Sequence, residues 1–476
     1  MRQNGLTRRW FIGGMAGAAA TMGTRRLFAM ADAAKVPDAK LKMGVLSDIH
    51  LNREGDEDTF LNALSYFRDA GADAVLIAGD IADTGRIVQL KRCADCWFKI
   101  FPNGKAPDGR TVEQLFIYGN HCVTAWTWGN PYKDNEAGAA AEAIGYKENR
   151  ARIWEEFFHE PYQPIWLKRV KGFPVIGAHW EERGKGIDIE EFMKAHAKEI
   201  DPALPFFYTQ HAHPKDTCFG RWSWGHDDGR STRALSPYPN AIALSGHSHY
   251  SLTDERTVWQ GAFTSINTSS LRYTSLDFAL RENSNGNNYG YKAKKRERAM
   301  RSLGTGDGRQ GMLLSVFDDH VVIERREFLG NQSLGDDWVF PLPCADPKPF
   351  AYVERAKRRT APQFPAGAEV KIALTKDKKE RQLVEITFPA AEAKQKCRVF
   401  EYEVTAVLVE DDVDLIQLQR RVIAPDFHLP EKSAGKPGIC VLFADDLPNK
   451  GHYRFDVRPI ECFGHKGEPI HGTAVI

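Results

Sequence analysis

Short apolar runs alternate with helical stretches along residues 41–330, and several of these runs end at a polar side chain. The clearest runs cover residues 43–47, 74–78, 115–118, 205–209 and 241–244. Continuous apolar runs of this length are typical of strands buried on both faces of a sheet. Because helical stretches separate the runs, the pattern predicts an α/β domain with its functional residues at the ends of strands.

Four stretches have the apolar spacing of amphipathic helices, at residues 58–70, 87–100, 148–158 and 189–199. In the first, Phe60, Leu64 and Phe67 recur at intervals of three and four residues, which places them on one helix face. Residues 312–327 return to strand character. We expect them to close the second sheet of the domain.

Beyond residue 361 the pattern changes to short strand-like runs with turn signals between them. Pro362 and Pro365 mark a linker-like stretch, and the runs that follow cover residues 369–374, 383–388, 398–409, 414–424, 438–443 and 453–459. This spacing predicts a small all-β sandwich domain over residues 361–476. Its final segment, residues 452–469, resembles the last strands of a fibronectin type III domain. No cluster of metal ligands occurs in it.

Length and composition narrow the class of protein. A chain of 476 residues is too long for one ordinary core and suggests two or three domains. The chain is 42% hydrophobic and 27% charged, as in soluble globular proteins, and its body has no apolar stretch that could span a bilayer. The formal net charge of +1 gives no basic footprint for nucleic acid and counts against a nuclease.

The N-terminus has the composition of a targeting segment. Residues 1–31 contain five arginines and no acidic residue, followed by a weakly apolar Gly- and Ala-rich stretch and a small-residue cleavage site. Arg8 and Arg9, with Phe11 and Ile12 after them, resemble a twin-arginine export signal. An ordinary secretory signal or a basic tail is the alternative. We expect a signal peptide at residues 1–31, the twin-arginine export machinery as a partner, and a periplasmic or secreted mature protein without a transmembrane segment.

Oxygen and imidazole donors follow the five apolar runs. They are Asp48, His50, Asp80, Asn120, His121, His211, His247 and His249. Burying so many polar side chains at strand ends is costly unless they converge on something that compensates them, and a metal cluster does so. The donor set lacks thiolates, which suits Mn, Fe, Zn or Ni rather than a structural zinc site.

In chain order these residues form the blocks D-x-H, G-D, G-N-H, a lone His and G-H-x-H. The set resembles the calcineurin-like metallophosphoesterase superfamily over residues 41–330. The resemblance implies a four-layer αββα sandwich, with two facing mixed sheets, as a domain spanning residues 38–330. It also implies a hydrolase for a small phosphorylated substrate, a phosphate monoester or diester, attacked by a water that the metals activate.

The resemblance further implies two divalent or trivalent metal ions that share Asp80. One metal ion would take Asp48, His50 and His249, and the other Asn120, His211 and His247. His121 would bind no metal and would assist the leaving group as an acid. The alternative function is a non-catalytic metal-binding or cell-surface interaction protein that uses the C-terminal sandwich as its contact surface.

Three residues near these blocks leave alternatives open. His213 competes with His211, but the family ligand is usually the first His after the strand, which leaves His213 to face substrate or solvent. Cys122 stands where many relatives carry Asp or Glu, so His121 is either less basic or held by another acid. Asp83 is expected to support its loop rather than bind a metal.

The remaining motifs have a structural interpretation. Cys93 and Cys96 form a C-x-x-C without a partner pair and are expected to be ordinary thiols. Residues 122–145 and 281–311 look like insertions, the second a solvated loop. A surface loop is also the favoured interpretation for three cations that could meet a phosphate: His226, Arg230 and Arg233.

Overall fold

The computed structural model describes residues 38–52, 54–128, 135–180, 189–218, 227–274, 308–393, 398–410, 413–425, 427 and 435–476. The expected signal peptide, His226 and most of the 281–311 insertion lie outside these ranges. Among the residues described, no helix is both long enough and apolar enough to span a membrane.

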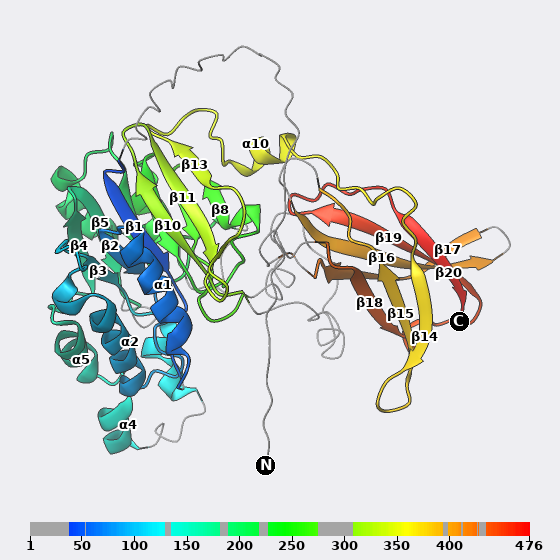
Figure 1. Ribbon diagram of the computed structural model, residues 1–476, viewed down its shortest axis with the longest axis horizontal. Helices are drawn as coiled ribbons and strands as arrows, with labels where there is room; N and C mark the ends of the chain where they lie inside the picture. The colour runs from blue at the N-terminus through cyan, green and yellow to red at the C-terminus, as the bar shows by residue number, and fades with distance from the viewer. Residues whose placement is uncertain are drawn as a thin grey trace, which may run out of the picture. The chain divides into compact units, whose positions relative to one another are not determined.

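The first sheet has seven strands and holds three of the predicted runs (Figure 1). Its order is β12-β11-β10-β1-β2-β3, and β13 also pairs with β11. Strands β1, β2 and β3 are parallel, and β10 runs antiparallel to β1. The strands span Leu41–Leu46 (β1), Ala74–Ile77 (β2), Glu113–Phe116 (β3), Gln310–Val316 (β10), His320–Glu327 (β11), Gln332–Ser333 (β12) and Trp338–Pro341 (β13).

The placement of residues 312–327 differs from the expectation. They form β10 and β11, and Val45 of β1 pairs with Met312 of β10, so these strands extend the first sheet rather than close the second. Strand character along the sequence carries no information on the partner strand, because pairing depends on residues more than 250 positions away.

The second sheet has six strands in the order β4-β5-β6-β7-β9-β8. Strands β5, β6, β7 and β9 are parallel, and the edge strands β4 and β8 are antiparallel to their neighbours. The strands span Ile165–Val170 (β4), Phe173–Ala178 (β5), Phe206–Thr209 (β6), Ala241–Ser245 (β7), Val258–Gln260 (β8) and Thr264–Asn267 (β9).

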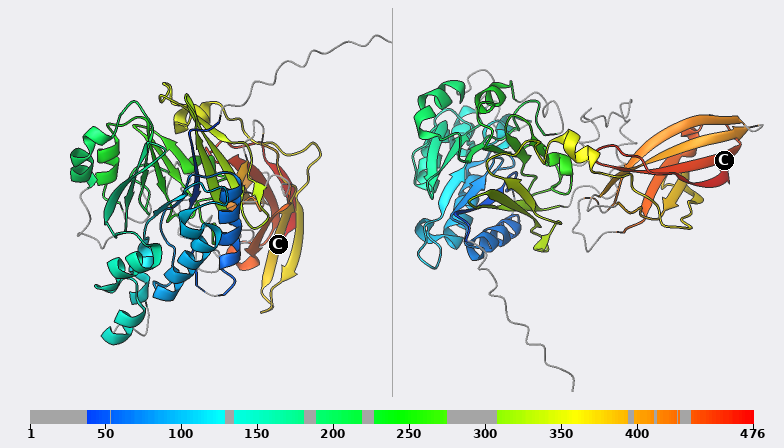
Figure 2. Two further views of the ribbon diagram at one scale, coloured as in Figure 1. Left: turned by 60° about the vertical axis from the view of Figure 1, so that its left-hand side comes forward. Right: turned by 90° about the horizontal axis from the view of Figure 1, so that it is seen from above.

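Helices cover the outer face of each sheet, and the two sheets pack on each other. One core joins the first sheet to α1 (Glu57–Asp69), α2 (Ile87–Ile100) and α5 (Asn149–Phe158). A second core lies between the sheets, and a third joins the second sheet to α6 (Ile189–Ala195) and α7 (Arg230–Leu235). The right view of Figure 2 shows blue and green helices on opposite sides of the strands. The predicted αββα order of layers is therefore confirmed.

The helices follow the predicted apolar spacing. In α1, Phe60, Ala63, Leu64 and Phe67 are buried on one face. The prediction for residues 189–199 is too long, because α6 ends at Ala195 and a short 3-10 turn follows. The helices span Glu57–Asp69 (α1), Ile87–Ile100 (α2), Asn120–Val123 (α3), Glu136–Glu142 (α4), Asn149–Phe158 (α5), Ile189–Ala195 (α6), Arg230–Leu235 (α7) and Tyr352–Lys357 (α10).

The C-terminal region is rich in strands, as the sequence predicts. One antiparallel sheet has the order β14-β15-β18, the other β17-β16-β19-β20, and residues of both sheets share one hydrophobic core. The last strand, β20, lies beyond the predicted runs. The strands span Lys371–Lys376 (β14), Gln382–Phe388 (β15), Val399–Glu410 (β16), Val413–Ile423 (β17), Gly438–Phe443 (β18), His452–Glu461 (β19) and Ile470–Val475 (β20).

Candidate metal centre

The predicted donors come from loops at the ends of five strands. Strands β1, β2 and β3 of the first sheet and β6 and β7 of the second each lead into one of these loops. Because the carboxyl ends of parallel strands meet at one edge of a sheet, two facing sheets can present all five loops to the same place. The structure brings all seven predicted ligands together there.

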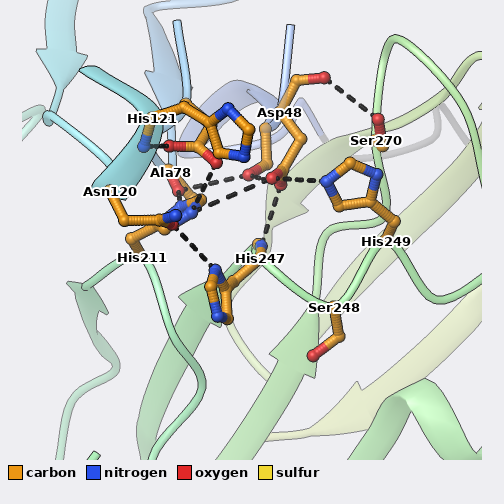
Figure 3. A network of polar contacts seen from close by, with 12 residues as sticks. Asp48, Ala78, Asn120, His121, His211, His247, Ser248, His249 and Ser270 are labelled. Atoms are coloured by element: carbon orange, nitrogen blue, oxygen red, sulfur yellow. Dashed lines mark hydrogen bonds and ion pairs between the residues drawn. The ribbon is translucent and has the colours of Figure 1, made fainter. Parts of the chain in front are cut away.

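Six of the seven side chains form two groups of three. Figure 3 labels Asp48 and His249 of one group and His211 and His247 of the other, with Asn120 nearby. Asp48, His50 and His249 make one group, and Asp80, His211 and His247 make the other, with ligand atoms within 4.8 Å of one another in each group. Asn120 belongs with the second group, because its Oδ1 lies 2.9 Å from His247 Nδ1. All seven are buried, and Asn120, at 7% exposed, is the most accessible.

Asp48 lies at the centre of the first group. Its Oδ1 is 2.9 Å from His249 Nε2 and 3.7 Å from His50 Nε2. Its Oδ2 accepts hydrogen bonds from the Ser47 hydroxyl and, at 2.9 Å, from the backbone N–H of His247. One oxygen is therefore fixed by the protein, and the other faces the imidazoles.

The two carboxylate oxygens of Asp80 also differ in their contacts, and Asp80 lies between the two groups. Its Oδ1 accepts the backbone N–H of His121 at 2.8 Å. Its Oδ2 is 3.0 Å from His211 Nε2, in the second group, and 3.8 Å from His50 Nε2, in the first. A single carboxylate oxygen thus faces imidazoles of both groups, as a shared ligand must.

Imidazole orientation is set by acceptors behind the rings. Nδ1 of His211 lies 2.8 Å from the carbonyl oxygen of Ala78, and Nδ1 of His249 lies 3.0 Å from that of Tyr273. A carbonyl acceptor requires a hydrogen on Nδ1, so Nε2 is the ring nitrogen of each residue that is directed toward the centre and can bind a metal.

Five of the seven predicted ligands have a left-handed backbone conformation. The φ angles are +50° at Asp48, +49° at His50, +50° at Asp80, +70° at His247 and +53° at His249. Residues with a Cβ rarely adopt this region, and such strain concentrates at functional sites. The loops are shaped to turn these side chains inward at a cost in backbone energy.

The glycines of the motifs leave room for the ligands. A Cβ at Gly79 would overlap the ring of His211, one at Gly119 the carboxylate of Asp80, and one at Gly246 the side chains of Ser47 and Asp48. The motif glycines are therefore required by close approach of the ligands.

The two carboxylates are held as anions. Burial alone would raise the pKa of Asp48, but His249 and His211 lower it well below its usual value. Burial also acts to raise the pKa of Asp80, and His211 and His121 lower it overall. Burial lowers the pKa of His50, yet the nearby carboxylates of Asp48, Asp83 and Asp80 raise it to about 10. Two buried anions surrounded by imidazoles attract positive charge, whether protons or metal ions.

The donor set fits metal ions. Asp48 Oδ1 and His211 Nε2 are buried atoms that make no hydrogen bond within the described residues, which is expensive unless a ligand completes them. Carboxylate, carboxamide and imidazole ligands without thiolate are those of Mn, Fe, Zn or Ni centres. The two groups therefore fit two metal ions.

His121 lies beside the centre but belongs to neither of the two ligand groups. Its side chain is 28% exposed, and its Nδ1 lies 2.6 Å from the backbone oxygen of Asp83 and 3.9 Å from the Asp83 carboxylate. Asp83 also accepts from His50 Nδ1 at 3.0 Å. Asp83 thus supports its loop, as expected, and in addition orients His121. A third group of potential ligands, His50, Asp83 and His121, overlaps the first.

Cys122 does not occupy the position of an orienting acid. Its side chain is buried in the core next to α2, and its sulfur accepts the backbone N–H of Ala82 at 3.5 Å. Burial, with a smaller effect of Asp80, raises the pKa of its thiol to about 12. Of the two alternatives for His121, the geometry favours the second, with Asp83 as the acid. Cys93 and Cys96 are free thiols, as expected.

His213 differs from its predicted position. It is 1% exposed, and its Nδ1 lies 3.3 Å from the Ser248 hydroxyl, so it faces neither substrate nor solvent. Its packing is made by residues distant in sequence, which the local motif does not reveal. Arg230 and Arg233 pair with Asp228 and Glu190 at the surface, in agreement with a structural role.

Three aromatic residues beside the centre have no part in the motifs. Trp128 lies edge-on to His121 with 5.0 Å between ring centroids, and Tyr273 lies 4.4 Å from His249. Trp180 lies 5.9 Å from His211 and 5.8 Å from His247. Trp128 and Tyr273 are 54% and 40% exposed. Only Trp128 had a sequence signal, because it follows the Asn-His pair in a Trp-rich segment.

The fold and the two ligand groups define an αββα domain with a binuclear-type metal centre. Residues 41–251 match the sequence profile of the family described as calcineurin-like phosphoesterase, and this part of the chain is a calcineurin-like metallophosphoesterase domain. A comparison with curated proteins finds no match.

A comparison with solved structures also returned matches. A dimetal phosphatase from Danio rerio has 10% identity and a TM-score of 0.35, over 64% of this chain and 100% of that chain. A predicted phosphoesterase from Streptococcus pneumoniae has 12% identity and a TM-score of 0.26, over 63% and 97%. The GAP50 anchor in the inner membrane complex of Plasmodium has 9% identity and a TM-score of 0.35, over 63% and 88%.

Proposed function

We propose that this protein is an exported phosphoesterase that uses two metal ions to hydrolyse phosphate monoesters or diesters. The observation that carries the proposal is the position of Asp80 Oδ2 between imidazoles of two ligand groups, 3.0 Å from His211 Nε2 and 3.8 Å from His50 Nε2. A centre built around one shared carboxylate is suited to hold two cations close together.

The residues divide into those that hold the ions and those that act on the ester. Asp48, His50 and His249 would hold one ion and Asn120, His211 and His247 the other, with Asp80 shared. When bound, the ions supply Lewis-acid activation of water and neutralise the charge on the phosphoryl oxygens. Proton transfer to the leaving group would depend on the side chains around the ions.

His121 is the residue proposed to move a proton. Its Nδ1 hydrogen is directed to the Asp83 carbonyl, so Nε2 is the atom that can donate to a departing alkoxide. Its 28% exposure places it where a substrate can reach it, in contrast to the buried ligands. A general acid of this kind contributes about 10²- to 10⁴-fold to the rate.

The test is metal analysis and turnover on one preparation of the full mature chain. We expect about two metal ions per chain and hydrolysis of aryl phosphate mono- or diesters, with metal identity following availability. A chain that binds metal but hydrolyses no phosphate ester would support the alternative, a non-catalytic metal-binding or cell-surface interaction protein. A chain that binds no metal and hydrolyses no phosphate ester would overturn the proposal.

Export is a separate part of the proposal and rests on residues 1–31 alone. Replacing Arg8 and Arg9 by Lys should leave the precursor in the cytoplasm, and replacing the nearby Arg25 and Arg26 by Lys should not. Cell fractionation followed by immunoblotting gives the result. Equal export of the two variants would contradict the twin-arginine interpretation.

A further inference from the structure

A second polar cavity is lined by none of the metal-centre residues. Its volume is about 360 Å³, and it is bounded by β11, the segment from Leu334 to Val339, and helix α10 with the residues that flank it. Figure 1 shows α10 in yellow between β13 and the C-terminal strands along the chain. Helix α10 contacts the phosphoesterase domain through Arg355, whose Nη1 donates to the carbonyl oxygen of Val258 at 3.0 Å.

The cavity has a high density of guanidinium groups. Its lining includes Arg325, Arg355, Arg358, Arg359 and Arg398, against the acidic residues Glu255, Asp336 and Asp337. Glu255 accepts from both Arg355 and Arg359, at 2.7 and 2.8 Å. The single negative charge of Glu255 is therefore shared by two of the arginines.

Among the described residues, Arg325 is a buried cation whose hydrogen bonds go to backbone oxygens and not to a carboxylate. It is 5% exposed, and its Nη1 and Nη2 donate to the backbone oxygens of Leu252 and Asp336. Its guanidinium lies 4.5 Å from the centroid of the Trp338 ring. Within the described residues its Nε makes no hydrogen bond, and neither does Nε of the buried Arg355. Carbonyls and a ring compensate a buried charge less well than an anion does.

The electrostatics agree with an excess of positive charge. Burial is the main cause that lowers the pKa of Arg325 to about 10; Glu255 and Asp337 act to raise it, and Arg398 and Arg355 act to lower it. Burial acts to raise the pKa of Glu255, but the neighbouring cations, chiefly Arg355 and Arg325, lower it to about 2. Like charges have been brought together in a space that is large enough for a small anion.

A purely structural role explains part of this arrangement. The pairs of Arg355 and Arg359 with Glu255 tie α10 to the turn before β8. That role does not require Arg325 to be buried beside other cations. It also leaves Arg358 unexplained, because this exposed side chain donates only to the carbonyl oxygen of Pro349 among the described residues.

We propose that this cavity is a binding site for a phosphate-bearing anion, separate from the metal centre. Several planar guanidinium groups approaching from different elements match the tetrahedral oxygens of phosphate, which accept bidentate, charge-assisted hydrogen bonds. The volume lies in the range of small-molecule sites. The site depends on no step of the proposed hydrolysis.

The test is calorimetric titration of the full metal-loaded chain with inorganic phosphate at constant ionic strength. Asp80→Ala removes the shared ligand of the metal centre, so binding that survives this change belongs elsewhere. In the Asp80→Ala variant, the additional change Arg358→Glu should weaken phosphate binding at least about tenfold, because it reverses one charge at the cavity. Arg152→Glu, at an exposed position of helix α5, is the matched control and should leave the affinity unchanged.

The outcomes separate this site from the proposed enzyme. Phosphate binding that survives Asp80→Ala and falls with Arg358→Glu supports the cavity, even in a chain without hydrolase activity. Loss of all phosphate binding in Asp80→Ala, or equal affinity of the Arg358→Glu and Arg152→Glu variants, would overturn it. A parallel titration with glycerol 3-phosphate tells a free phosphate ligand from a phosphate ester, and saturable binding of either supports the site.

Discussion

His121 is held by the backbone of Asp83 and not by a residue of its own helix. The Nδ1 atom lies 2.6 Å from the Asp83 carbonyl oxygen, and the Asp83 carboxylate lies 3.9 Å away. The first contact fixes which ring nitrogen can face a substrate, and the second places a negative charge behind the ring. The same carboxylate holds His50 through its Nδ1, so one residue positions a proposed acid and a metal ligand.

We expect His121→Ala to lower kcat by about 10²- to 10⁴-fold with the metal content unchanged, because the variant removes only the proton donor. Asp83→Asn keeps the backbone carbonyl but removes the charge, and should lower kcat by roughly 10-fold to 100-fold. Steady-state kinetics and metal analysis on the same samples give both readouts. Wild-type kcat in His121→Ala would refute its role.

Asp80→Ala should lose both metal ions, because its Oδ2 faces imidazoles of the two groups. Asp73→Ala is the control, since Asp73 is also a buried carboxylate but accepts from the backbone N–H of Lys42, away from the ligands. Elemental analysis after desalting gives the number of ions per chain. Two ions retained in Asp80→Ala would show that the carboxylate is not shared.

Gly246→Ala tests whether close approach, and not backbone freedom, requires glycine in the last motif. The new Cβ would overlap the side chains of Ser47 and Asp48, so we expect loss of metal together with a lower Tm. Gly172→Ala is the contrast, because its φ of +88° is strained but its Cβ would meet no atom within 4 Å. It should cost about 1–2 kcal/mol and leave the metal content intact. Equal metal content in both variants would count against the steric explanation.

Stability should fall in mild acid because of His179. This residue is buried, its Nδ1 accepts the backbone N–H of Tyr118 at 3.0 Å, and burial lowers its pKa to about 3. The unfolded chain, with an ordinary histidine pKa near 6.5, binds more protons than the folded one between these values. The free energy of unfolding should therefore decrease by about 1.4 kcal/mol per pH unit below pH 6.5.

The variant that isolates this effect is His179→Gln, which retains an acceptor but cannot titrate. Urea unfolding at pH 7.0 and 5.0 gives the slope in each protein. We expect the variant to be less stable at pH 7.0, through lost ring packing with Trp154 and Tyr162, yet less sensitive to pH. An unchanged slope would show that His179 is not the titrating group.

Trp128 should favour esters with a flat leaving group, because its exposed ring lies beside His121. Trp128→Ala is expected to raise KM for an aryl phosphate by roughly threefold to tenfold and to change KM for a small alkyl phosphate little. Leu204→Ala, at an equally exposed apolar position, is the control. A uniform change for both substrates would indicate a structural role for Trp128.

The sequence predicted the five strands that lead into the metal centre, and four of the eight helices in the described residues, because each depends on local spacing. The donors were predicted from the motifs that follow those strands. The left-handed turns at Asp48 and His247 follow strands that the apolar pattern marks plainly. The partner of β10 was not predictable in this way, because Val45 and Met312 meet only after the whole domain has formed. The burial of His213 and the place of Tyr273 beside His249 likewise depend on contacts distant in sequence. The cavity at Arg325 combines residues that lie far apart in the sequence, from Thr253 to Arg398, and leaves no motif.

The left-handed backbone conformation at five ligand positions sets stability against activity in the evolution of the centre. Each turn costs about 1–2 kcal/mol that a glycine would not incur. A descendant that exchanged a ligand for glycine would lose its chemistry and gain a more robust fold at the same time. Selection for activity must therefore oppose selection for stability at these few positions. A lineage that is no longer selected for activity would rapidly lose the ligands and retain a stable, inactive fold.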